Sequence, residues 1–296
     1  MISIIISSAN PSFLTQVIKN IEDTIGVPYE LISFDNSKGQ KGICEVYNLG
    51  IQRAKYDILC FMHEDIEIRT KAWGKIVTDH FNEYKGLGLL GVAGSTYKTL
   101  TPAGWVGTGI NTARANYIQS HKASNDPPKH YYINPNNEKI VQVACVDGVW
   151  LCTTKKIAFE FGFDDHTFKK FHAYDLDFSL AIGQRYKVAV TYDVMLDHFS
   201  EGKYDNVWME ETLKLHDKWN KILPVNVGST SLEIAMKIEK NTFKVFIDQL
   251  LQFNYSIKTP LNMLSANKRF YSSIPLLYIK LKYYVFLKYL KAGKAT

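Results

Sequence analysis

The chain has 296 residues, of which 46% are hydrophobic and 22% are charged, and this is the composition of an ordinary globular protein with ample core. It contains no run of about 18 uncharged apolar residues, which excludes a membrane-spanning helix. The formal net charge is +6, but seven cations and no acid lie between Lys268 and the end, so the first 267 residues carry −1. The body of the chain therefore lacks the basic pattern of a nucleic-acid-binding protein.

The N-terminal part alternates between predicted strands and predicted helices. Residues Met1–Ile6 are apolar and have no basic leader, so we expect a buried strand there and not a signal peptide. Asn10-Pro11 is typical of a helix start. Strands are predicted at 3–7, 30–34, 57–62 and 89–93, with helices between them. This alternation predicts right-handed crossovers and a mainly parallel α/β sheet.

The second half is less regular. Residues 95–138 show few clear periods, and a stretch of this length is usually functional or flexible. Further elements are predicted at 140–146, 149–153, 173–186, 188–192 and 207–222. After Pro224 the pattern becomes largely helical, so we divide the chain into residues 1–227 and a C-terminal extension, 228–296. The four cysteines have no metal-like spacing, and we expect buried reduced thiols, which fits a cytoplasmic protein.

Polar clusters follow four of the predicted strands. They are Ser7-Ser8-Ala9-Asn10, Asp35-Asn36-Ser37, His63-Glu64-Asp65 and Asp147-Gly148. Taken alone, the third cluster fits a simple turn as well as a site for a divalent cation and a phosphorylated ligand. In a parallel sheet, however, the carboxyl ends of the strands share one edge, where ligands bind. Four clusters in order therefore predict a ligand cleft.

Over residues 1–205 this order of motifs resembles the family-2-like glycosyltransferases of the GT-A fold. The resemblance implies a Rossmann-like, mainly parallel sheet flanked by helices. In that family an Asp after the second strand contacts the nucleotide base, and Asp35 followed by Asn36 matches it. The metal motif is Asp-x-Asp, whose place is occupied by His63-Glu64-Asp65. Asp65 matches the second Asp, while His63 departs from the first.

Two later segments extend the resemblance. Tyr174-Asp175-Leu176-Asp177 resembles the family segment that carries the general base, with Tyr174 in place of the usual Glu. The resemblance implies that Asp175 is the base, and we expect Asp177, about 200° away on a helix, to bond to the structure instead. His198 lies where a His completes the metal shell or contacts the diphosphate.

The resemblance implies a metal-dependent hexosyltransferase-like enzyme of polysaccharide biosynthesis. It would move a sugar, with inversion, from a nucleotide-diphosphate donor, with UDP-sugar favoured, to a glycan or lipid-linked acceptor. The cofactor would be Mn²⁺ or Mg²⁺. The expected roles are catalysis for Asp175, metal binding for Asp65, His198 and His63, and donor binding for Ser7, Asp35, Asn36, Glu64 and Asp147. Trp105 fits either a sugar-stacking group or a packed loop anchor, and Asp147-Gly148 fits either a sugar contact or a plain turn.

The sequence also bears on three other functions: a non-catalytic scaffold, a nucleotidyltransferase and a dehydrogenase. The departures at His63 and Tyr174 favour a non-catalytic nucleotide-sugar-binding or scaffold protein on the same fold. A nucleotidyltransferase or a Rossmann dehydrogenase is disfavoured because no glycine-rich loop follows the first strand. The basic, aromatic-rich segment 274–290 suits a peripheral contact with the inner face of a membrane as well as it suits packing on the catalytic domain or on another subunit.

Overall fold

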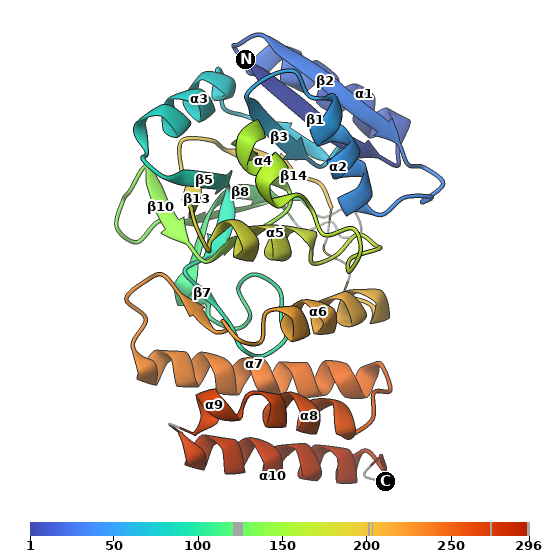
Figure 1. The fold of residues 1–296 in the computed structure, drawn as a ribbon, viewed down its shortest axis with the longest axis vertical. Helices are drawn as coiled ribbons and strands as arrows, with labels where there is room; N and C mark the ends of the chain where they lie inside the picture. Colours follow the sequence, from blue (N-terminus) through green and yellow to red (C-terminus); the bar gives the residue numbers. More distant parts are fainter. Residues whose placement is uncertain (121–126, 201, 203, 273, 295–296) are drawn as a thin grey trace.

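The structure is a computed structural model, and it describes residues 1–120, 127–200, 202, 204–272 and 274–294 (Figure 1). Residues 121–126 of the expected irregular stretch therefore lie outside the described part. The main sheet has seven strands in the order β10-β13-β5-β12-β3-β1-β2. Their bounds are β1 Ile2–Ser8, β2 Tyr29–Asp35, β3 Ile58–Met62, β5 Leu87–Gly91, β10 Ile140–Val143, β12 Trp150–Thr154 and β13 Lys187–Thr191.

The main sheet is mixed but mostly parallel in direction. β1 pairs in parallel with β2 and β3, and β13 pairs in parallel with β5. β12 is antiparallel to both of its neighbours, and β10 is antiparallel to β13. Five of the seven strands therefore run the same way, which confirms the predicted α/β class and brings the ends of β1, β2 and β3 to one edge.

Helices cover both faces of this sheet, as Figure 1 shows. They are α1 Pro11–Thr24, α2 Ile43–Arg53, α3 Trp73–Glu83, α4 Lys155–Phe161, α5 Tyr174–Ile182 and α6 Asn206–Lys218. Successive β1 side chains point to opposite faces, so Ile4 and Ile6 belong to one apolar cluster and Ile5 to the other. A Cβ at Gly50 of α2 would lie 2.4 Å from Ile5, so only glycine lets this helix approach β1 so closely.

A second sheet completes the site edge, and two of its strands, β8 and β9, lie in the stretch that we expected to be irregular. Its order is β11-β6-β8-β14-β4, and β9 pairs with β8. The bounds are β4 Ile66–Ile68, β6 Ala93–Ser95, β8 Ala113–Gln119, β9 Lys129–Ile133, β11 Cys145–Val146 and β14 Leu196–His198. β4, β6, β11 and β14 have only two or three residues and pair with distant segments, so sequence periodicity gives little sign of them, although β11 falls within the element predicted at 140–146.

The C-terminal extension stacks in layers beneath this domain (Figure 1). β15 (Val225–Asn226) pairs with β7 (Tyr97–Lys98) and leads into α7 Leu232–Gln252, α8 Lys258–Ala266, α9 Lys268–Tyr271 and α10 Pro275–Lys291. Side chains of α7 and α10, among them Phe246 and Val285, belong to the same apolar cluster as Ile5 of β1. None of the helices in the described residues has the length and apolarity needed to cross a bilayer.

Candidate functional site

A cavity of about 570 Å³ opens at the edge where β1, β3 and β14 end. Eight of the nine predicted site residues line it: Ser7, Asn36, His63, Glu64, Asp65, Asp147, Asp175 and His198. The ninth, Asp35, lies beside it at the exposed end of β2, opposite Ser8 in the strand register. A hydrogen bond from Ser37 lowers the pKa of the Asp35 carboxyl, which is therefore an ionised acceptor at neutral pH. The four polar clusters thus meet at one cleft.

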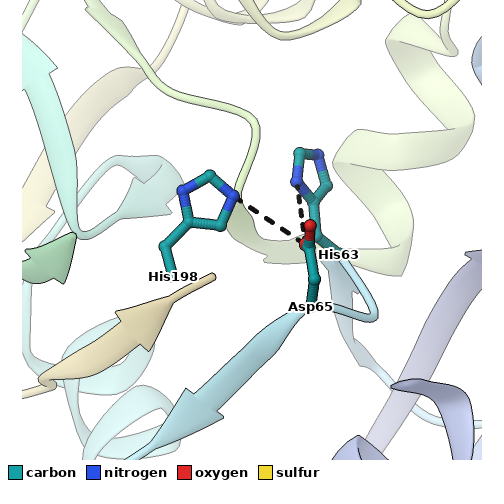
Figure 2. Close-up of side chains that lie close together, drawn as sticks. All are labelled: His63, Asp65 and His198. Atoms are coloured by element: carbon teal, nitrogen blue, oxygen red, sulfur yellow. Dashed lines mark ion pairs between the residues drawn. The ribbon is translucent and has the colours of Figure 1, made fainter. Parts of the chain in front are cut away.

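Three of the lining side chains form a compact group of metal-ligand atoms. Nδ1 of His63 lies 3.9 Å from Oδ1 of Asp65, and Nε2 of His198 lies 3.8 Å from the same oxygen (Figure 2). One ligand atom from each residue lies within 4.8 Å of the other two. His63 and Asp65 flank the β3–β4 turn, whereas His198 ends β14, which pairs with β4. The pairing of these two short strands therefore brings residues 133 positions apart together.

The outer nitrogen of the His63 ring is bonded to Tyr174. Nε2 of His63 lies 2.9 Å from the Tyr174 hydroxyl, which in turn lies 3.1 Å from the carbonyl oxygen of Gly148. Because a carbonyl can only accept, the hydroxyl donates to Gly148, and Nε2 of His63 must then donate to the hydroxyl. This assigns the His63 proton to Nε2 and leaves the lone pair of Nδ1 on the side of Asp65.

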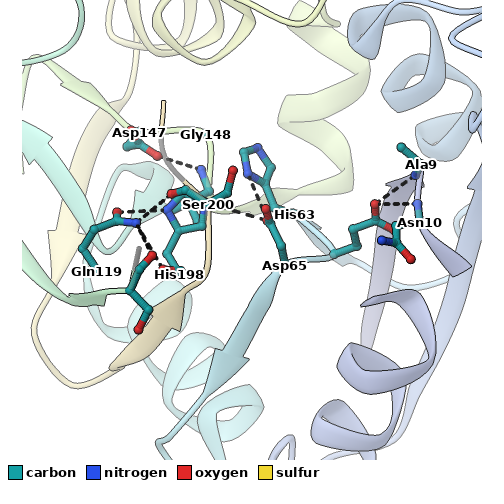
Figure 3. Close-up of polar contacts among 12 residues, drawn as sticks. Ala9, Asn10, His63, Asp65, Gln119, Asp147, Gly148, His198 and Ser200 are labelled. Atoms are coloured by element: carbon teal, nitrogen blue, oxygen red, sulfur yellow. Dashed lines mark hydrogen bonds and ion pairs between the residues drawn. The ribbon is translucent and has the colours of Figure 1, made fainter. Parts of the chain in front are cut away.

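The second imidazole is held in the same manner by Gln119 of β8. Nε2 of Gln119 lies near three backbone carbonyls, those of Ser120, His198 and Ser200, at 3.1, 3.2 and 2.7 Å (Figure 3). This orients the amide so that its oxygen faces Nδ1 of His198 at 3.3 Å. Nδ1 therefore carries the proton, and Nε2 presents its lone pair toward Asp65.

The group fits a divalent cation. Two imidazole nitrogens and a carboxylate oxygen converge, and both rings are oriented by partners on their other nitrogen, as metal-ligating histidines usually are. Burial lowers the pKa of His63, against the opposing effect of Asp65, so its neutral, metal-binding form prevails. Mixed nitrogen and oxygen donors suit Mn²⁺ better than Mg²⁺.

Glu64 points away from this group. Its carboxylate accepts hydrogen bonds from the Ser8 hydroxyl at 2.6 Å and from the backbone N–H groups of Ala9 and Asn10 at 3.0 and 2.9 Å. Ala9 and Asn10, seen in Figure 3, immediately precede α1. In this structure Glu64 therefore fixes the β1–α1 loop against the turn that carries His63 and Asp65.

The carboxylates of Asp147 and Asp175 also line the cavity. Oδ2 of Asp175 accepts the N–H of Gly148 at 3.0 Å. Burial, together with the negative charge of Asp147, raises the pKa of Asp175 to about 7. A carboxyl with this pKa can both take up and release a proton near neutral pH. Asp177 is turned elsewhere, bonding to Trp219 and Lys218 at 2.7 Å each, which is the structural role we expected for it.

Some residues of the site carried no clear signal in the sequence. Gln119 lies in the stretch that we expected to be irregular, and no local pattern distinguishes it from a surface glutamine. The sequence marks Tyr174 only as a departure from the family pattern, whereas in the structure its hydroxyl supports His63. Trp105 lines the cavity, and its carbonyl accepts a weak bond from Cys145 at 3.6 Å. Its sugar-stacking role stays a prediction.

Comparisons with known proteins agree with this fold. Residues 3–221 match the model of a family described as "Glycosyltransferase like family". No protein with a curated description matches the chain. A crystal structure of GalNAc-T7 with UDP, GalNAc and Mn²⁺ is similar at 12% identity and a TM-score of 0.51, covering 84% of this chain and 56% of that one. This likeness shows the GT-A fold, although the chain spans only about half the length of GalNAc-T7.

Two other solved structures are more distant. Staphylococcus aureus TarS has 10% identity and a TM-score of 0.46, covering 95% of this chain and 54% of that chain. A197 from STIV has 12% identity and a TM-score of 0.39, covering 68% of this chain and 86% of that chain.

Proposed function

The chain belongs to the family described as "Glycosyltransferase like family", and we propose that it is a metal-dependent glycosyltransferase that uses a nucleoside-diphosphate sugar. One observation carries the proposal: a half-buried His–Asp–His group shares a single cavity with the Asp175 carboxyl, whose pKa is raised to about 7 by burial and by the charge of Asp147. A cation held by the His–Asp–His group suits the binding of a diphosphate, and the Asp175 carboxyl suits the removal of a proton from an acceptor hydroxyl.

The cation site is proposed at Asp65, His63 and His198. Mn²⁺ or Mg²⁺ bound there would neutralise the charge that develops on the diphosphate leaving group. The comparison with GalNAc-T7, solved with UDP and Mn²⁺, supports this ligand class and favours a UDP-sugar. Tyr174 and Gln119 would keep both imidazoles in the tautomer that such a site needs.

Donor recognition is proposed for the polar ends of β1 and β2. The exposed carboxylate of Asp35 can accept a hydrogen bond from a base N–H, and Asn36 and Ser7 line the cavity beside it. Asp147 lies farther along the cavity and is proposed to accept from sugar hydroxyls. Glu64, also predicted to contact the donor, would act mainly through the loop that it holds.

Asp175 is proposed as the general base of a single displacement. Its carboxylate would take the proton of the acceptor hydroxyl, whose oxygen bonds to the anomeric carbon while the bond from that carbon to the diphosphate oxygen breaks. One displacement inverts the anomeric carbon. Ionised Asp175 is needed for this step, and its pKa of about 7 provides a strong enough base with a large ionised fraction at neutral pH.

The acceptor, cellular setting and partners are proposed more broadly. A glycan or lipid-linked acceptor in polysaccharide biosynthesis, on the cytoplasmic side of a membrane, would suit a chain of this family. The C-terminal extension would provide contact with that membrane or with a second copy of the chain.

Calorimetric titration tests the proposal most directly. UDP and GDP are titrated into the protein with and without Mn²⁺, followed by a screen for hydrolysis of UDP-, GDP- and dTDP-sugars. We expect nucleotide binding that depends on Mn²⁺ and is strongest for UDP. Absence of any metal-dependent nucleotide binding would contradict the proposal, while such binding without turnover of any donor would favour the scaffold alternative.

A further inference from the structure

The outermost helix, α10, has two apolar faces of which the described residues cover only one. Its inner face packs on α7, α8 and α9 through buried Leu281, Val285 and Tyr289 (Figure 1). The outer face carries five large apolar side chains that are 50–72% exposed: Leu276, Ile279, Tyr283, Phe286 and Leu290. We name these five the outer stripe. Their spacing of three, four, three and four places them in one line along the helix. Since α10 is apolar on both faces, its sequence shows no two-faced pattern.

Lysines lie on both flanks of the outer stripe. At 100° per residue, Lys280 and Lys291 lie along one side of it and Lys282 along the other. Lys288 and Lys294 bond within the fold, to Asp248 and Asn254. The last 48 residues, 249–296, contain eight Lys or Arg and no Asp or Glu. An apolar line with basic flanks is the arrangement of a helix that lies in a lipid interface.

We infer that α10 binds the surface of an anionic lipid bilayer, lying in its plane with the outer stripe among the acyl chains and the flanking lysines at the headgroups. Charge selects this occupant. A second copy of the chain would bring an equally basic helix, with no acidic residue in its last 48 positions, against the first. An anionic lipid surface attracts each of the same lysines. The inference goes beyond sugar transfer and does not depend on it.

The test is sedimentation of the full chain with vesicles of two compositions: phosphatidylcholine alone, and phosphatidylcholine with phosphatidylglycerol in equal parts. We expect the partition coefficient to be at least about tenfold higher for the mixed vesicles and to fall as salt is raised. Equal partition into both compositions, or no binding to either, would overturn the inference.

A matched pair of variants tests the outer stripe itself. Phe286→Ser removes a phenylalanine that is 50% exposed on α10, and Phe159→Ser removes one that is 56% exposed on α4. We expect a roughly tenfold loss of vesicle binding for Phe286→Ser, a larger loss for Ile279→Ser/Phe286→Ser, and none for Phe159→Ser. Lys280→Glu/Lys291→Glu should abolish the preference for phosphatidylglycerol.

All of these substitutions are on the surface, so thermal unfolding should stay unchanged and should establish that each variant is folded. Sedimentation equilibrium without lipid provides a second measurement. A dimer that the outer-stripe variants dissociate, with no vesicle binding by the wild type, would assign the outer stripe to a second copy instead. UDP titration of the same variants separates this outcome from failure of the proposed sugar transfer, because the outer stripe lies outside the donor cavity.

Discussion

The Tyr174 hydroxyl lies 2.9 Å from Nε2 of His63, so the two departures from the family pattern contact each other. His63 stands in place of an Asp, and Tyr174 stands in place of a Glu. A neutral phenol that donates to Gly148 can accept a hydrogen bond from the imidazole N–H without adding another charge beside Asp175. His63 and Tyr174 therefore form a compatible pair that can replace the Asp and Glu of the family pattern. Neither departure is by itself evidence against metal-dependent activity.

Tyr174→Phe should lower the affinity for Mn²⁺. The ring keeps its packing, but Nε2 of His63 loses its acceptor and the tautomer is no longer fixed. We expect a decrease of roughly 10-fold, the lower end of what loss of such an outer partner costs. Electron paramagnetic resonance of free Mn²⁺ during a titration measures this affinity directly. Tyr192→Phe, whose hydroxyl donates to the Ile133 carbonyl, is the control and should bind Mn²⁺ like the wild type.

Gln119→Leu should weaken the same site from its other side. It removes the acceptor of His198 Nδ1 and the donor that ties His198 and Ser200 to β8. We again expect Mn²⁺ affinity to fall by roughly 10-fold. Gln184→Leu, at the end of α5, removes only a local bond to the Leu180 carbonyl and serves as control. Unchanged Mn²⁺ binding in Gln119→Leu would show that Gln119 does not support the metal site.

The sequence predicted the parts of this site that lie at the carboxyl ends of β1, β2 and β3. His63 and Asp65 follow the fully buried β3, Asn36 follows β2, and Ser7 lies near the end of β1, so strand order alone implied their meeting. Gln119 and the reach of β14 to β4 could not be predicted. They depend on the pairing of β14 with β4 and β8, which are distant from it in the chain, and β4 and β14 have only three residues each, too few to show a period.

Asp175→Asn should abolish sugar transfer and leave donor binding intact. The amide keeps the shape of the side chain but cannot take up a proton, so we expect turnover to fall by roughly 10²- to 10⁴-fold. Calorimetric titration with UDP and Mn²⁺ should give the wild-type affinity. Asp177→Asn is the control on the same helix: it should melt at a lower temperature, because Lys218 loses a buried partner, yet retain turnover when folded. Wild-type turnover in Asp175→Asn would rule out its role as the base.

The same carboxyl predicts a pH dependence. Burial and the charge of Asp147 raise the pKa of Asp175 from 3.8 to about 7, and only the ionised form is a base. The value of kcat/KM should therefore rise with pH up to about 7 and then level off. Asp147→Asn should move the rising part of this pH profile to lower pH, because it removes the negative charge that helps to raise the pKa of Asp175. A pH-independent rate would contradict the role of Asp175 as the base.

The stability of the protein should depend on pH in the opposite sense. Because the pKa of Asp175 is higher in the folded chain than in the unfolded chain, ionisation of this carboxyl destabilises the fold as the pH rises toward 7. Asp175→Asn should therefore raise the melting temperature more at pH 7 than at pH 4.

Glu239 of α7 connects the C-terminal extension to the loop that carries Trp105. Its fully buried carboxylate accepts from the Tyr97 hydroxyl, the Leu100 N–H and both the N–H and the hydroxyl of Thr101, at 2.7–3.0 Å. From the other side, buried Lys98 donates to the carbonyls of Ala103 and Gly104, which immediately precede Trp105. The extension thus helps to shape one wall of the cavity.

Glu239→Gln should therefore destabilise the fold and weaken donor binding together. The new NH2 group would face the backbone N–H of Leu100 or of Thr101, from which it cannot accept, at a cost of about 1–3 kcal/mol in the free energy of unfolding, as for other buried donors left unpaired. Urea unfolding measures this cost, and calorimetric titration of the folded variant with UDP and Mn²⁺ measures the effect on the cavity. Glu233→Gln, on the same helix, breaks only an exposed pair with Lys237 and should change stability by less than about 0.5 kcal/mol. Equal stability of the two variants would show that α7 does not hold the Trp105 loop.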